Sequence, residues 1–314
     1  MEALKKYFLP SIVVFQLMIL AGCTVPRGTS PESSSLATPG NTRQAAVISI
    51  VAAENFYGDI AKQLGGNRVS VKSILSDPNI DPHEYETNVQ DAIAVSDANI
   101  VVKNGLGYDT WMDKLLSASP NPDRIVLTAG NIAPHLLAEN PHVWYGIENI
   151  QAIAQSITDS MKKIDPTDSA IFDDNLSTFL NSLEPILQKI ADIKTKYNGI
   201  PIGLTETLYL YQTQLMGLNV LTPYEFEKAI SAGNDPPADS IQITNDQISK
   251  KQVKVLIYNS QKVTPVTTNL LNAAKALNIP EIYVTETMPK NKTYQTWMMD
   301  QLNSLLNSLE LVVQ

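Results

Sequence analysis

The sequence predicts an α/β protein of two lobes, each built on a parallel sheet, joined by one long helix. Short β-branched runs alternate with helical stretches from 47 to 127, and the same order recurs from 201 to 309. Between these halves, apolar residues recur at helical spacing over 166–197. The chain after residue 45 is also long enough for two modest hydrophobic cores.

In the first half, the strands are expected at 47–51, 69–75, 100–102 and 124–127, and the helices at 55–64, 91–98, 108–116 and 149–161. The helix that begins at Asn55 should end at Gly65-Gly66, because glycine readily adopts the backbone conformation that closes a helix. Strands and helices that alternate at such short intervals favour a parallel sheet with helices packed on it.

In the second half, the strands are expected at 201–204, 253–258 and 281–284, and the helices up to 215, at 266–277 and at 293–309. The connecting helix should span 166–198. Pro185 interrupts its apolar pattern and can kink it, because proline has no N–H for the helical ladder.

The first 22 residues have the pattern of a secretory signal peptide. Lys5 and Lys6 precede an apolar stretch, 8–20, that is too short for a comfortable membrane span. Leu20-Ala21-Gly22-Cys23 resembles the lipobox of bacterial lipoproteins, which implies that Cys23 becomes the lipidated first residue. Because Cys23 is the only cysteine, disulfides cannot contribute to the fold of this exported chain.

Residues 23–45 are rich in Ser, Thr, Pro and Gly and predict a flexible tether that follows the lipidated cysteine. The N-terminal lobe should then span 46–165 and the C-terminal lobe 199–314. The formal charge is −9, and loss of 1–22 removes two lysines and one glutamate. An acidic surface of this kind disfavours nucleic acid and anionic membrane surfaces as partners, and it is compatible with a cationic ligand.

Two of the three histidines follow prolines in similar motifs. His83 lies in Asp81-Pro82-His83-Glu84-Tyr85-Glu86, and His142 lies in Asn140-Pro141-His142-Val143-Trp144. Histidine is the commonest metal ligand in proteins, so this placement suggests a metal site. Spacing alone is equally compatible with two histidines in turns.

Carboxylates follow the predicted strands of the second half. Glu206 comes just after 201–204, and Glu286 just after 281–284, while His83 follows 69–75. Ligands of parallel α/β sheets bind outside the carboxyl ends of the strands, so these side chains should face a cleft between the lobes. The alternatives are a helix-start carboxylate for Glu206 and a solvated carboxylate for Glu286.

Four other residues near these motifs are not expected to bind the metal. His135 follows Pro134 and should lie in a surface loop. Glu54 follows the first strand and could support a site without binding the metal, or could simply be solvated. Trp144 and Tyr85 should exclude water from the histidines, unless they only pack in the core.

Taken together, these motifs resemble those of the substrate-binding lipoproteins of bacterial ABC importers, of the zinc- and manganese-type (cluster A-I). The resemblance extends from Val47 onward. It rests on the two Pro-His motifs, on Asn104-Gly105-Leu106-Gly107, and on the runs 255–261 and 284–287.

The resemblance implies four metal ligands: His83, His142, Glu206 and Glu286. The chain departs from the family at Glu286, where an Asp is usual, and at Gly146, where an Asp often follows the second histidine motif. The second departure could remove support for the imidazole and weaken metal affinity.

The function implied is that of an extracytoplasmic receptor, lipid-anchored through Cys23, which captures Zn²⁺ or Mn²⁺ and delivers it to the transmembrane subunit of an ABC permease. Two neutral imidazoles and two carboxylates would neutralise a divalent cation and fill a tetrahedral shell, so we expect a binding protein and no enzyme. The protein is also expected to be a monomer. One alternative is a receptor for a metal chelate such as a siderophore or cobalamin. A metallo-hydrolase would need an open coordination position, and the chain has no His-Glu-x-x-His signature.

Overall fold

The computed structural model describes residues 47–77, 80 and 85–313, which belong to one compact unit, Ala45–Gln314. The predicted signal peptide, the tether with Cys23, and His83 therefore lie outside the described residues. Among the residues that are described, no helix has the length and apolar character needed to cross a membrane.

The first sheet has four parallel strands, in the order β2-β1-β3-β4. They are β1 (Ile48–Glu54), β2 (Val69–Leu75), β3 (Ile100–Lys103) and β4 (Ile125–Thr128). In the central strand, Ile50 pairs with Val71 on one side and with Ile100 on the other. The strands β1 and β3 are apolar along nearly their whole length, because helices cover both faces of a parallel sheet.

The helices of this half follow the strands in the predicted order. They are α1 (Asn55–Gly65), α2 (Val89–Asp97), α3 (Thr110–Ala118), α4 (Ala129–Ile132) and α5 (Ile147–Ile164). The start of α2 is fixed by a capping box, in which Asn88 accepts from the backbone of Asp91 and Asp91 accepts from the backbone of Asn88. The end of α1 is followed by Gly66 at φ +55°, as the glycine pair predicted.

The second sheet repeats the topology of the first, with the parallel order β6-β5-β7-β8. Its strands are β5 (Pro201–Leu204), β6 (Asn219–Val220), β7 (Leu256–Asn259) and β8 (Glu281–Val284). The helices of this half are α8 (Leu210–Leu215), α9 (Tyr224–Ser231), α10 (Ala238–Ser249), α11 (Pro265–Ala276) and α12 (Tyr294–Val313). The predicted fold class, two parallel-sheet α/β halves with a helical connection, is therefore confirmed.

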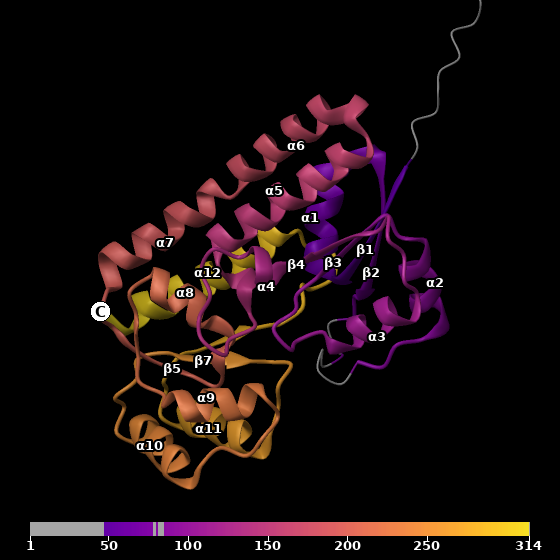
Figure 1. Ribbon diagram of the computed structural model, residues 1–314. Coiled ribbons are helices and arrows are strands. Elements are labelled where there is room, and N and C mark those ends of the chain that lie inside the picture. The colour runs from indigo at the N-terminus through magenta and orange to yellow at the C-terminus, as the bar shows by residue number, and fades with distance from the viewer. Residues whose placement is uncertain (1–46, 78–79, 81–84, 314) are drawn as a thin grey trace, which may run out of the picture. The chain divides into compact units, whose positions relative to one another are not determined.

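The connection between the halves is helical but divided. After a 3-10 turn at Pro166–Asp168, α6 (Ser169–Ser182) and α7 (Glu184–Tyr197) follow one another with a break at Leu183 (Figure 1). Pro185 lies in the first turn of α7, where a missing N–H leaves no helical hydrogen bond unmade. The single helix expected over 166–198 is thus two helices in sequence, and the break lies two residues before the proline.

The hydrophobic core joins both sheets. The largest cluster of buried side chains contains residues from β1, β3, β5, β7 and β8 together with residues from α1, α5, α6, α7 and α12. On the opposite faces, α2 and α3 cover the first sheet, and α9, α10 and α11 cover the second. Each sheet is therefore covered on both faces, and the helices of the connection and α12 contribute to one shared layer.

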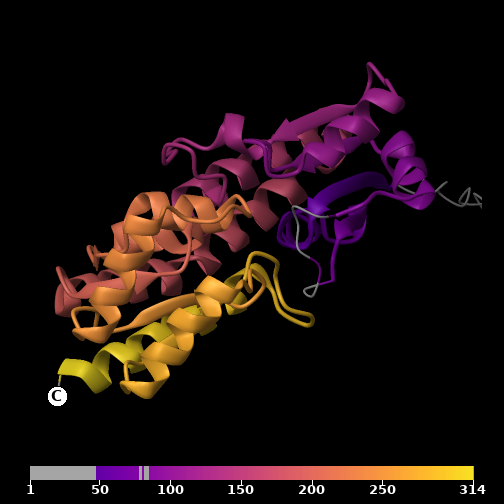
Figure 2. The same cartoon turned by 90° about the horizontal axis from the view of Figure 1, so that it is seen from below.

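The segment between β8 and α12 binds the first half directly. Asn55 donates from Nδ2 to the carbonyl of Met288 and accepts from its N–H, at 2.6 and 3.0 Å. Asp59 accepts from the N–H of Tyr294 at 2.8 Å. Seen from below, this yellow loop reaches toward the indigo first half (Figure 2). The residues that follow β8 are thereby held at the carboxyl edge of β1.

Candidate metal centre

Three of the four predicted ligands come together. His142, Glu206 and Glu286 each offer one ligand atom, and these atoms lie within 4.8 Å of one another. The side chains are buried, with 0, 3 and 1 % of their residue surfaces exposed. The fourth predicted ligand, His83, lies outside the described residues, so its role stays a prediction.

Both halves of the molecule supply the cluster. In the order β6-β5-β7-β8, β5 is followed in the chain by β6 on one side and then by β7 on its other side. Ligands of open α/β sheets bind at such a switch point, here between β5 and β7. Glu206 follows β5 by two residues, and Glu286 follows β8 by two residues. His142 comes from the first half, directly before the 3-10 turn Val143–Tyr145 that leads into α5.

The imidazole of His142 is oriented by Asn140. Its Nδ1 lies 2.8 Å from Asn140 Oδ1, an atom that can only accept a hydrogen bond. The proton of the neutral ring is therefore on Nδ1, and Nε2 keeps the lone pair that a metal needs. Although residue 146 is a glycine, the ring thus has a support in Asn140.

Glu206 and Glu286 share one hydrogen-bond donor. Asn259, the last residue of β7, donates from Nδ2 to Oε1 of Glu206 and, at 2.8 Å, to Oε1 of Glu286. Glu206 precedes a 3-10 turn but makes no capping hydrogen bond to it. Glu206 thus stands at the start of the turn, as one alternative expected, without capping it. The other alternative, a solvated carboxylate, is wrong for Glu286, which is 1 % exposed.

Glu286 also accepts a hydrogen bond from the first half of the molecule. The hydroxyl of Tyr108 donates to Glu286 Oε2 at 3.0 Å. Burial raises the pKa of this hydroxyl well above its usual value, and the neighbouring charge of Glu286 raises that pKa further. Tyr108 therefore stays a hydrogen-bond donor at any physiological pH.

The loop after β3 positions both His142 and Tyr108. Asp109 accepts from the N–H groups of Asn104 and Gly105, at 2.7 and 2.8 Å, and so closes the turn 104–109. Asn104 then donates from Nδ2 to the carbonyl of Pro141, the residue before His142, at 2.9 Å. A side chain at Gly105 would place its Cβ 2.4 Å from Thr128, and φ there is +76°, so only glycine fits.

Two further carboxyl groups are buried near the cluster. Desolvation raises the pKa of Glu54, at the end of β1, well above its usual value, and the charge of Asp109 raises it further. Desolvation also raises the pKa of Glu227, on α9, and there the charge of Glu206 adds to the effect. Both shifts favour the protonated form of the carboxyl group, which lowers the negative charge beside the three candidate ligands. The idea that Glu54 is merely solvated is wrong, since none of its surface is exposed.

The aromatic neighbours of the histidines behave differently from each other. Trp144 is fully buried, its ring contacts that of His142 edge-on at 5.1 Å, and it stacks on Phe56 at 4.7 Å. It excludes water from the imidazole, as predicted. Tyr85 instead contacts Trp111 and donates to Asp91, so it belongs to the packing of α2 and α3. His135 is exposed and paired with Glu148, as a surface-loop histidine should be.

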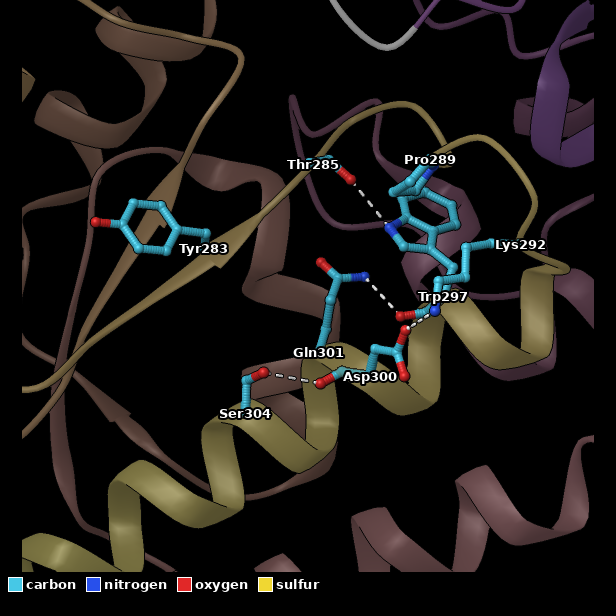
Figure 3. Close-up of a pocket in the computed structure, with 8 residues that line it drawn as sticks. All are labelled: Tyr283, Thr285, Pro289, Lys292, Trp297, Asp300, Gln301 and Ser304. Carbon is cyan, nitrogen blue, oxygen red and sulfur yellow. Dashed lines mark hydrogen bonds and ion pairs between the residues drawn. The ribbon is translucent and has the colours of Figure 1, made fainter.

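A pocket of about 180 Å³ lies behind the Glu286 segment but contains none of the three candidate ligands. Figure 3 shows its lining, in which Trp297 donates to Thr285 Oγ1 at 3.0 Å. The carbonyl of Thr285 also accepts from the hydroxyl of Tyr145 at 2.8 Å. The residues around this pocket therefore support the loop that carries Glu286, and none of them is a candidate metal ligand.

Three residues of the site were not singled out by sequence reasoning: Asn140, Tyr108 and Asn259. Asn140 and Asn259 lie inside motifs that were recognised, two residues before His142 and at the end of a predicted strand. Their position offered a signal, since polar residues at strand ends and beside a ligand are its usual supports. Tyr108 follows the Gly-rich turn and offered no signal of its own.

The site combines one imidazole with two carboxylates in a buried setting. Two carboxylates placed this close repel one another unless a cation or a donor lies between them. A divalent cation would neutralise both, and nitrogen and oxygen donors suit first-row transition metals. The residues present therefore fit a divalent metal ion as a bound ligand.

Two parallel α/β sheets that bring such a cluster to their carboxyl edges define a two-lobed α/β binding protein with a candidate metal centre. Residues 50–308 match the family described as zinc-uptake complex component A, periplasmic (ZnuA). Because the match covers most of the chain, the protein belongs to this family.

Individual relatives agree with this assignment. The chain is 26 % identical over 275 residues to a metal ABC transporter substrate-binding lipoprotein, SsaB, of Streptococcus sanguinis, with 82 % of each chain covered. It is 28 % identical over 232 residues to the manganese-binding lipoprotein MntA of Halalkalibacterium halodurans, covering 71 % of this chain and 72 % of that one. Its fold is similar to that of the periplasmic zinc-binding protein TroA of Treponema pallidum, with a TM-score of 0.70, 17 % identity, and coverage of 84 % of this chain and 99 % of that one.

Proposed function

We propose that this protein is the substrate-binding component of an ABC importer and that it captures Zn²⁺ or Mn²⁺ for delivery to the membrane permease. The observation that carries this proposal is the buried cluster of His142, Glu206 and Glu286, whose ligand atoms lie within 4.8 Å of one another. The names of its relatives, which mention zinc uptake and manganese binding, support both metals as cargo.

The fourth ligand in this proposal is His83. It belongs to the segment after β2, and β2 lies beside β1 in the first sheet. With His83 the site holds two imidazoles and two carboxylates, whose charge of −2 balances the cation. Four protein ligands complete a tetrahedral shell and leave no position for a reactive water, which suits binding and release better than hydrolysis.

Binding and release follow from the division of ligands between the halves. His83 and His142 come from the first half, and Glu206 and Glu286 from the second, so separation of the halves would break the coordination. Residues on both sides of the cluster also bond across it, as Tyr108 does to Glu286. The two-part helical connection, α6 and α7, packs in the shared core and should restrict the separation to a small movement.

The same proposal places the protein outside the cytoplasm, anchored by a lipid on Cys23 and a tether over 23–45. The naming of its relatives as lipoproteins supports this placement. A monomer with an N-terminal lobe at 46–165, the helical connection at 166–198 and a C-terminal lobe at 199–314 would present one metal site to the permease.

Metal analysis and binding titration of the mature chain test the proposal. The protein should bind one Zn²⁺ or Mn²⁺, and binding should raise its melting temperature, because the ion binds only the folded state. His142→Ala combined with Glu206→Gln should abolish the binding, whereas Glu148→Gln, an exposed carboxylate, should leave it unchanged. Absence of binding to either metal would contradict the proposal. Binding of a metal chelate that survives His83→Ala with His142→Ala would support the alternative chelate receptor.

A further inference from the structure

We propose that Asn259 is a positioning residue that restricts Glu206 and Glu286 to one ligand oxygen each and so favours zinc over manganese. This inference rests on the proposed function, because it concerns the selectivity of the same site. Asn259 is neutral and does not itself bind the metal. It would control how many carboxylate oxygens do.

A single nitrogen of Asn259 binds both carboxylates. A side-chain amide carries two N–H donors on the same atom. In Asn259 one hydrogen is directed to Oε1 of Glu206 and the other to Oε1 of Glu286. The residue is 1 % exposed, so water does not compete for these bonds. One amide thus links two carboxylates that would otherwise repel each other.

The orientation of the amide is determined by its other atom. Asn259 Oδ1 accepts from the N–H of Gln261 at 2.9 Å, and a flipped amide would place its own N–H₂ group against that donor. The backbone N–H of Asn259 is held in turn by Thr205 Oγ1 at 3.1 Å. The NH₂ group therefore has to face the two carboxylates.

Each carboxylate has two oxygens, and in both residues Oε1 is already a hydrogen-bond acceptor. In Glu286 the other oxygen, Oε2, accepts from Tyr108 at 3.0 Å. An oxygen that accepts a hydrogen bond keeps one lone pair, but symmetric chelation of a metal by both oxygens would turn the carboxylate away from its donors. In both residues the donors therefore hold the carboxylate in one orientation beside His142.

The coordination number determines which metal fits best. Two imidazoles and two single-oxygen carboxylates make four ligands, the number that zinc prefers in proteins. If both carboxylates chelated, the same residues would supply six, which suits the octahedral, oxygen-rich coordination of manganese. Asn259 therefore raises the preference for zinc by preventing the extra two contacts.

The test compares the mature wild-type chain with Asn259→Leu and Asn259→Asp. The first variant removes the amide without adding charge. The second keeps the acceptor for Gln261 and removes the two donors, so it preserves the turn if the first fails to fold. Dissociation constants for Zn²⁺ and Mn²⁺ are measured by competition with a chelator. In both variants the ratio of the manganese to the zinc dissociation constant should fall by about tenfold, the size expected for a lost support of a ligand.

Asn55→Leu is the matched control, because it removes hydrogen bonds to the segment after Glu286 without touching a carboxylate. Its ratio should stay that of the wild type, whatever happens to the two separate affinities. X-ray absorption should also show more nitrogen and oxygen neighbours around Mn²⁺ in the Asn259 variants than in the wild type.

Equal losses of affinity for both metals in the Asn259 variants would overturn the inference, and so would an unchanged coordination number. If the wild-type chain bound neither metal, the proposed function itself would fail. Metal binding by the wild type with an unchanged ratio in the variants would leave that function intact and refute only the role of Asn259.

Discussion

The side-chain oxygen of Asn140 lies 2.8 Å from Nδ1 of His142 and 3.0 Å from the backbone nitrogen of the same residue. One acceptor thus fixes both the ring and the main chain of a candidate ligand. The amide nitrogen of Asn140 donates to the carbonyl of Thr207 at 2.8 Å, and Thr207 follows Glu206 directly. Asn140 therefore couples a ligand of the first half to the segment that carries a ligand of the second.

Replacement of Asn140 should lower metal affinity through His142. Asn140→Leu removes the acceptor for Nδ1, so the ring loses its fixed tautomer and orientation, and affinity should fall about 10- to 100-fold. Asn140→Asp keeps an acceptor at the same place and should retain most of the affinity. Isothermal titration with Zn²⁺ would measure both. Equal losses in the two variants would show that the bond to Thr207, and not the bond to His142, is the important one.

Tyr108→Phe should accelerate metal release. The change removes only the hydroxyl that binds Glu286 Oε2 across the two halves. Hydrogen bonds to charged groups contribute about 1.5–3 kcal/mol, which corresponds to a loss of affinity of roughly one to two orders of magnitude. Stopped-flow measurement of Zn²⁺ transfer to a chelator should show the loss mainly in the dissociation rate.

Tyr209→Phe is the control for this variant. Tyr209 is as buried as Tyr108, but its hydroxyl has no hydrogen-bond partner within the part of the chain that the structure describes. Its loss should therefore leave the release rate unchanged and can stabilise the fold slightly. If the Tyr108→Phe and Tyr209→Phe variants released Zn²⁺ at the same rate, the hydrogen bond from Tyr108 to Glu286 would not hold the two halves together.

The three candidate ligands that the structure describes could be predicted from the sequence because they stand at positions that the pattern marks. His142 follows a proline in a recognisable motif, and Glu206 and Glu286 follow short apolar strands whose bounds the structure reproduces at 201–204 and 281–284. Strand ends in a parallel sheet meet at one edge, so the pairing of distant carboxylates followed from the fold class.

The partners of the residues that support the site could not be predicted, because these contacts join segments far apart in the sequence. Asn259 reaches a carboxylate 53 residues away, and Tyr108 one that is 178 residues away. Local pattern contains no such information. The two-residue strand β6 was missed for a similar reason, since Asn219 and Val220 form a strand only through their pairing with β5.

Glu54 presents a buried carboxyl group at the end of β1, and neither of its oxygens has a hydrogen-bond partner among the described residues. Desolvation, and next the charge of Asp109, raise its pKa well above the usual value, while the charge of Lys103 lowers it by a smaller amount. The folded protein therefore holds this proton more tightly than the unfolded chain, in which the pKa is about 4.3. Its contribution to stability is complete below that pH and is lost as the pH rises toward the folded-state pKa.

Glu54→Gln should consequently flatten the pH dependence of stability. A neutral amide of nearly the same shape carries no titrating proton, so the decline expected of the wild type above about pH 5 should be shallower in the variant by up to about 1.4 kcal/mol per pH unit. Urea unfolding of the metal-free protein between pH 5 and 8 measures this slope. Glu148→Gln, which changes an exposed carboxylate, should keep the wild-type slope. If the Glu54→Gln variant also kept the wild-type slope, the fold would have to stabilise the charged form of Glu54 despite its burial.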